Sequence, residues 1–191
     1  MSNILQIKIQ NQKALDAIAM QIEKCKICKK DKIGLAVPGE GNPSAKIVFI
    51  GEAPGKTESK TGRPFVGRSG KLLRSLISDA GIKEKDFYIT SPVKYLPKHG
   101  TPTEKEIAHG KVHLLKQLDI IKPKIIVLLG NTAAKALLQS ELKISEAHGT
   151  AFTQDKIKYF VSYHPAAALH LPKLRAILAS DFKKLKRFIK A

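Results

Sequence analysis

The loop from Gly51 to Gly67 combines the residue types that a ligand-binding or catalytic site needs. It follows the apolar run 46–50 and is rich in glycine and proline, which let a backbone approach a ligand closely. Glu52 stands where the apolar run ends, a favourable place for a catalytic carboxylate. Phe65 is the single aromatic residue of the loop, and it could cap the core or stack on a flat ring. Long loops in compact domains are usually functional, and an ordinary flexible connection is the alternative.

His164 opens a second loop of interest, directly after the apolar run 157–163. It is followed by Pro165 and then by the small residues 166–168. A single histidine that follows a strand more often has a structural role. Its position beyond a strand end, before residues that leave room for a substrate, favours a catalytic role instead.

The charge of the chain indicates what kind of substrate these loops would meet. Lys and Arg number 34 against 16 acidic residues, which gives a formal net charge of +18. Lysine is also a common solvated surface residue, but a charge this large favours a polyanion such as nucleic acid. With DNA as the partner, the small residues 166–168 would permit close approach of a strand, and Leu169 could wedge into the duplex.

The chain has two cysteines, Cys25 and Cys28, in a Cys-x-x-Cys arrangement. This spacing suits a metal ion, a cluster or a redox pair. One such pair supplies two ligands, whereas a closed tetrahedral site needs about four. No second Cys-x-x-Cys pair follows, so two cysteines without a ligand near a helix end are an equal alternative.

Strands and helices are expected to alternate along the chain. Apolar runs predict strands at 46–50, 87–90, 124–129 and 157–163. Helical spacing and capping residues predict helices near 11–24, from Ser69 to Gly81, from Thr103 to about 121, from Gly130 onward and over 172–191. We therefore expect a three-layer α/β/α fold around a central four-stranded, mainly parallel sheet. The loops after Ile50, Thr90 and Tyr163 should then converge on one cleft.

Length and composition favour one domain that covers residues 1–191. The chain has 191 residues, 43% of them hydrophobic, which is enough for a sizeable core. Its longest central apolar run is far too short to span a membrane, and the N-terminus lacks the pattern of a signal peptide. We expect an intracellular protein, cytoplasmic or nucleoid-associated, that acts as a monomer.

Five segments together resemble the family 4 uracil-DNA glycosylases. They are GEAPGKTESKTGRPFVGRSGKLL, YITSPVKYLP, TPTEKEIAHG, KIIVLLGNTAAKALL and YHPAAAL. The resemblance spans Cys25 to the C-terminus, and the combination of the first loop with the HPAAAL turn is its most specific part. It implies a DNA glycosylase that flips uracil out of DNA and hydrolyses its bond to deoxyribose, the first step of base-excision repair.

The resemblance also implies roles for individual residues. Glu52 would position or activate the attacking water, and Ala53 would offer a backbone amide to the flipped base. Phe65 would stack on the uracil ring. His164 would donate to the uracil oxygen that gathers charge as the bond breaks. Basic residues near the first loop would contact DNA phosphates, namely Arg63, Arg68 and Lys71.

The chain departs from the family at the residue that reads uracil. The family places an asparagine in the second strand, where this chain has Ser91. An asparagine side chain donates and accepts at once, whereas a serine hydroxyl is shorter and makes fewer contacts. The change leaves open a glycosylase with a shifted preference among deaminated bases, or a catalytically weak homologue that only binds DNA.

The second departure concerns the family's four-iron, four-sulfur cluster, which four cysteines bind. Cys25 and Cys28 match the first two positions. The third falls on Tyr95, and the fourth on Gly110, or on His109 if the alignment shifts by one residue. Thiolates normally supply all four ligands. We therefore expect no cofactor, with the two cysteines as remnants of the cluster site; His109 and Tyr95 as substitute ligands are the alternative.

Overall fold

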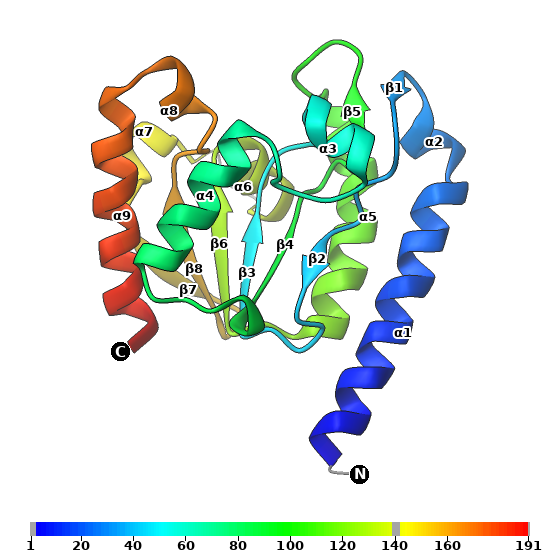
Figure 1. The fold of residues 1–191 in the computed structure, drawn as a ribbon, viewed down its shortest axis with the longest axis horizontal. Coiled ribbons are helices and arrows are strands. Elements are labelled where there is room, and N and C mark those ends of the chain that lie inside the picture. The colour runs from blue at the N-terminus through cyan, green and yellow to red at the C-terminus, as the bar shows by residue number, and fades with distance from the viewer. Residues whose placement is uncertain (1–2, 139–141, 191) are drawn as a thin grey trace.

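The computed structural model describes residues 3–138 and 142–190, which form an α/β structure around a central sheet (Figure 1). Six strands make up this sheet in the order β2-β4-β3-β6-β8-β7. Their bounds are β2 Glu40–Gly41, β3 Ile47–Ile50, β4 Phe87–Thr90, β6 Ile125–Leu129, β7 Ala151–Gln154 and β8 Ile157–Ser162. The four inner strands run parallel, and the two edge strands pair antiparallel to them.

The apolar runs form this parallel centre because both faces of the sheet are buried. Successive residues of a strand point to opposite faces. Ile47 and Phe49 of β3 therefore join one hydrophobic cluster, while Val48 and Ile50 join the other. All four of these side chains are almost fully buried.

Helices cover both faces, so the three-layer arrangement predicted from the sequence is confirmed (Figure 1). One face packs against α4, Arg68–Asp79, and α9, Lys173–Lys190. The opposite face packs against α1, Asn3–Lys24, α5, Glu104–Ile121, and α6, Asn131–Leu137. The capping box of Thr103 and Glu106 forms at the start of α5 as predicted.

Several details of the predicted fold were wrong. The sheet has six strands rather than four, because the short strands β2 and β7 extend its edges without a long apolar run. Helix α4 begins at Arg68 with Gly67 as its N-cap, so Ser69 lies inside the helix and does not cap it. The first loop contains a short helix, α3, Lys56–Thr61, that the sequence did not predict.

The remaining elements are short and lie outside the central sheet. They are helices α2 Lys26–Lys29, α7 Ile144–Ala147 and α8 Ala167–His170, a 3-10 turn over Glu84–Asp86, and strands β1 Lys32–Ile33 and β5 Leu96–Pro97, which pair with each other. Across residues 3–138 and 142–190, no helix combines the length and the apolar character needed to cross a membrane.

Candidate active site

The loops that follow β3, β4 and β8 meet at the carboxyl edge of the parallel strands. They line one cavity of about 250 Å³ with residues from each loop, among them Glu52, Phe65, Ser91 and His164. Ala53 lines the same cavity. The prediction that these three loops converge on one cleft is therefore confirmed. The cavity brings together a carboxylate, an aromatic ring, a hydroxyl and an imidazole.

Glu52 reaches the cavity from the end of β3, and a hydroxyl on a neighbouring helix holds its carboxylate. Thr132, in the first turn of α6, donates from Oγ1 to Glu52 Oε2 at 2.6 Å. Thr132 itself is buried. A fixed donor on one oxygen orients the other oxygen of the carboxylate, which suits a group that must position a water molecule. Sequence reasoning missed Thr132, although its place directly after β6 was a usable signal.

Phe65 is held in a backbone conformation that side chains rarely adopt. Its φ is 51°, and such left-handed residues cost about 1–3 kcal/mol and cluster at functional sites. Two glycines make room for it: a Cβ at Gly51 would lie 2.5 Å from the Phe65 ring, and a Cβ at Gly70 only 2.1 Å from its carbonyl carbon. Arg74 Nε donates to the Phe65 carbonyl at 3.1 Å. The surrounding structure thus fixes the ring, whose centroid lies 5.7 Å from that of His164.

Glu58 holds the same loop from the other side. Its side chain is 7% exposed, and Oε1 accepts from the backbone N–H groups of Val66 at 2.9 Å and Gly67 at 2.7 Å. The carboxylate therefore lies at the N-terminus of α4, where negative charge is favourable. Because Glu58 sits in the unpredicted helix α3, nothing in the sequence pattern pointed to this role.

The hydrogen bonding of His164 indicates which ring nitrogen carries the proton. The backbone N–H of Ala166 donates to Nδ1 at 3.2 Å, so Nδ1 is an acceptor and Nε2 is the protonated nitrogen of the neutral ring. Burial lowers the pKa of His164, and the Glu52 and Glu58 carboxylates oppose this shift only in part. His164 is therefore a neutral imidazole with an N–H donor at neutral pH.

Ser91 lies in the cavity but its hydroxyl is already engaged. Oγ donates to the carbonyl of Val93 at 2.9 Å, and the residue is buried. The hydroxyl hydrogen is therefore not free for a ligand, while the oxygen can still accept. The segment after β4 thus offers an acceptor at the position where the resemblance implies an asparagine with both functions.

None of the residues predicted to touch DNA is among those that line this cavity, although Arg63 and Arg68 are next in sequence to the lining residues Pro64 and Ser69. Arg63 forms a two-point ion pair with Glu40, at 2.7 and 2.9 Å, and this contact lowers the pKa of Glu40. Arg68 and Lys71 are exposed on the first turns of α4. Leu169 in α8 is only partly exposed.

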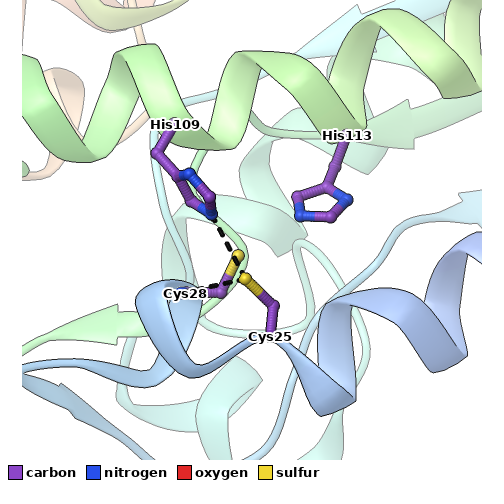
Figure 2. A group of neighbouring side chains, drawn as sticks. All are labelled: Cys25, Cys28, His109 and His113. Atoms are coloured by element: carbon purple, nitrogen blue, oxygen red, sulfur yellow. Dashed lines mark hydrogen bonds between the residues drawn. The ribbon is translucent and has the colours of Figure 1, made fainter.

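A second group of side chains comes together outside this cavity, between α2 and α5 (Figure 2). One potential ligand atom each from Cys25, Cys28, His109 and His113 lies within 4.8 Å of the others. Cys25 Sγ is 3.2 Å from His109 Nε2. Burial raises the pKa of the Cys28 thiol to about 12, and the Cys25 hydrogen bond adds to this.

The sequence contained a signal for this cluster that the search for a second Cys-x-x-Cys pair missed. His109 and His113 are four residues apart on α5 and therefore lie on one face of the helix. His109, one of the positions where the resemblance places a missing cysteine, is part of the cluster. Tyr95 is buried nearby, with its hydroxyl directed at the Ile22 carbonyl at 3.5 Å.

Comparisons with known proteins agree with this architecture. The profile of the uracil DNA glycosylase superfamily matches residues 38–190. Similar proteins include the type-4 uracil-DNA glycosylase of Sulfurisphaera tokodaii, 42% identical over 91% of this chain and 84% of that one. The type-4 enzyme of Saccharolobus solfataricus is 43% identical over 90% and 85% of the two chains. That of Archaeoglobus fulgidus is 39% identical over 90% and 92%. The chain therefore belongs to the uracil-DNA glycosylase superfamily, and within it to the type-4 family.

Proposed function

We propose that this protein flips uracil out of DNA and hydrolyses the bond that joins the base to deoxyribose, as the first step of base-excision repair. The observation that carries the proposal is that Glu52, Phe65 and His164 line one cavity, in a chain whose relatives are named uracil-DNA glycosylases. Its volume of about 250 Å³ equals that of about eight water molecules, which suits one small base.

The departing base is the group that most needs stabilisation. When the bond between C1′ and N1 breaks, its electron pair goes to uracil, and negative charge gathers on the uracil oxygens. The Nε2–H group of neutral His164 would donate to one of these oxygens, and the Ala53 backbone amide would donate to the base as well. Donors fixed where charge develops typically contribute about 10²–10³ in rate.

Glu52 would supply the nucleophile. Held by Thr132 on one oxygen, its carboxylate would orient a water molecule with the other oxygen. The water oxygen forms the new bond to C1′, and its proton passes to the carboxylate. Phe65 would stack on the flipped base, a contact worth about 1–3 kcal/mol. The scheme draws on side chains and backbone amides of this chain.

Ser91 supports a second candidate, a glycosylase with a shifted base preference. Uracil presents one N–H donor between two carbonyl acceptors. Because the Ser91 hydrogen is directed at Val93, Ser91 would accept from the uracil N–H but would not donate to the neighbouring carbonyl. Edge readout that leaves one group unpaired discriminates less well between bases.

DNA binding would rest on charge around the cavity. The exposed Arg68 and Lys71 would contact phosphates directly, whereas Arg63 would first have to leave Glu40. Leu169 would wedge into the duplex. We expect residues 1–191 to act as one domain and as a monomer inside the cell.

A labelled duplex with one uracil opposite guanine tests the proposal. We expect uracil release, seen as strand cleavage after alkaline treatment, and a fall of about 100-fold or more in single-turnover rate in Glu52→Gln and His164→Gln. Glu146→Gln is the control, since that side chain is exposed at 71%.

Duplexes with other deaminated bases separate the candidates. Release of hypoxanthine or xanthine in preference to uracil would support the shifted preference. No release of any base, together with retained salt-sensitive DNA binding, would contradict both enzymatic candidates and leave a DNA-binding homologue.

A further inference from the structure

The cluster of Cys25, Cys28, His109 and His113 has no role in the glycosylase scheme, yet it has the make-up of a metal site (Figure 2). We infer that these four side chains bind a single zinc ion in a closed tetrahedral site. The ion would stand in place of the four-iron, four-sulfur cluster that the family resemblance implies. This inference revises the sequence-based expectation that the two cysteines are remnants without a metal.

The iron–sulfur cluster does not fit the residues of this chain. Such a cluster takes four thiolates, and the chain contains two cysteines. The phenol of Tyr95 is buried at the position expected for the third thiolate. At Gly110, the position expected for the fourth, a Cβ would lie 2.2 Å from the Pro92 carbonyl oxygen. Because that contact is with backbone, no cysteine fits there unless α5 moves.

The spacing between the ligand atoms fits one ion. Zinc bonds of about 2.3 Å to sulfur and about 2.0–2.1 Å to nitrogen place the corners of a tetrahedron about 3.3–3.8 Å apart. The ligand atoms here lie within 4.8 Å of one another, and Cys25 Sγ and His109 Nε2 are 3.2 Å apart. Small side-chain rotations would therefore complete the tetrahedron. A cluster of several metal atoms would hold its ligands much farther apart.

The sequence spacing of the ligands agrees with the geometry. Cys25-x2-Cys28 and His109-x3-His113 together match the pattern of two cysteines followed by two histidines that is typical of structural zinc sites. The cysteines flank a tight turn in which the Cys28 backbone N–H donates to Cys25 Sγ at 3.4 Å. The histidines occupy one face of α5. Both pairs are thus fixed by local structure before any ion binds.

An unpaired polar atom at the cluster points independently to a ligand. His113 is 7% exposed, and its Nδ1 has no hydrogen-bond partner among the residues that the structure describes. Leaving a buried polar nitrogen unpaired costs about 1–3 kcal/mol. A metal ion bonded to one ring nitrogen of His113 would give this side chain the partner that the protein does not supply.

With four protein ligands, the site has no open position, so its role would be structural rather than catalytic. It would join the turn between α1 and α2 to α5. Both thiols would release their protons to the solvent as the ion binds. Because the unfolded chain does not hold the four ligands together, metal binding would stabilise the folded chain. Because Gly110 of α5 packs on Pro92, the ion would also support the segment that carries Ser91.

Metal analysis of the full-length protein is the direct test. We expect about one zinc and no stoichiometric iron per chain, and a colourless protein. After removal of the zinc with a chelator, Co²⁺ should restore one equivalent of metal with strong visible absorption from tetrahedral cobalt and near-ultraviolet absorption from thiolate-to-cobalt charge transfer. Zinc should then displace the cobalt. A brown protein with about two or about four irons per chain, or no metal binding above background, would overturn the inference.

Variants separate a zinc site from an accidental group of side chains. Cys28→Ser should lower the charge-transfer absorption in proportion to the lost thiolate, and His113→Gln should weaken Co²⁺ binding by more than about 100-fold. His99 is an exposed histidine near the same surface, so His99→Gln should leave the charge-transfer absorption and the Co²⁺ affinity unchanged. Where a variant fails to fold, the Co²⁺ spectrum of the unaltered protein decides: absorption of octahedral cobalt without charge transfer overturns the site.

Discussion

Removal of the Glu58 carboxylate should release the loop that presents Phe65. In Glu58→Ala, the backbone N–H groups of Val66 and Gly67 lose an acceptor at 2.9 and 2.7 Å. Hydrogen bonds to a charged group contribute about 1.5–3 kcal/mol each. Since water can reach part of this site, we expect the free energy of unfolding to fall by about 2–4 kcal/mol in total. Glu58→Gln keeps a neutral acceptor and should cost about 1 kcal/mol.

The effect on catalysis follows from the strain at Phe65. Its left-handed backbone, with φ at 51°, stores about 1–3 kcal/mol, which is similar to what Glu58 contributes. Without Glu58, loop conformations in which the Phe65 backbone is relaxed should compete with the conformation that places the ring in the cavity. If they are favoured by about 2 kcal/mol, the single-turnover rate of uracil release falls about 30-fold.

Urea unfolding and single-turnover excision measure the two effects on the same samples. Glu84→Ala is the matched control, because that side chain is 87% exposed and pairs with Arg74 at 3.5 Å, a contact worth at most about 1 kcal/mol. A Glu58→Ala protein that loses stability but excises uracil at the unaltered rate would refute the reasoning. The loop would then be held by the Phe65 contacts to Arg74 and Gly70 alone.

Three further predictions concern residues that line or support the cavity. Thr132→Val removes the 2.6 Å hydrogen bond to Glu52, a contact to a charged group that contributes about 1.5–3 kcal/mol, and should lower kcat by at least about tenfold with little change in KM. Ser91→Asn would add a donor toward the base and should raise the ratio of uracil to hypoxanthine release by about tenfold; an unchanged ratio would show that Ser91 does not read the base edge. In the folded chain, burial lowers the pKa of His164 below its ordinary value of 6.5. Between this lowered pKa and 6.5, the unfolded chain therefore binds a proton that the folded chain does not. The free energy of unfolding should therefore fall as the pH drops through this range. Urea unfolding at several pH values should show a smaller fall in His164→Asn, which lacks the titrating group.

The parallel centre of the fold and the position of the cavity followed from local sequence. A buried parallel strand is a short continuous apolar run, and the loops after such strands must meet at one edge of the sheet. Ile47–Ile50 and Ile125–Leu129 satisfy this pattern without help from distant residues. Glu52 and His164 could therefore be placed in one cavity from their positions after strands alone.

Other parts of the structure depend on contacts that sequence periodicity does not encode. The edge strand β2 is two residues long and forms because it pairs with β4. Glu58 accepts hydrogen bonds from backbone N–H groups that lie eight and nine residues later in the chain. The shape of the loop that brings these groups to Glu58 could not be predicted from the sequence pattern. His113 stands beside Cys25 and Cys28 only because α5 crosses the turn after α1.

The two walls of the cavity are held by different means, which explains how Ser91 keeps its place. On the Phe65 side, Glu58 Oε1 accepts from the backbone N–H groups of Val66 and Gly67. In the segment after β4, Lys94 is buried, and its Nζ donates to Thr90 Oγ1 and Gln117 Oε1 at 2.7 Å and to the Pro38 carbonyl at 3.1 Å. Burial lowers the pKa of Lys94 to about 7, while three acceptors match the three donors of an ammonium group. The segment after β4 is thus fixed by hydrogen bonds on both sides of Ser91, so we expect a substitution of Ser91 to change the hydrogen-bonding groups of the cavity without releasing the segment.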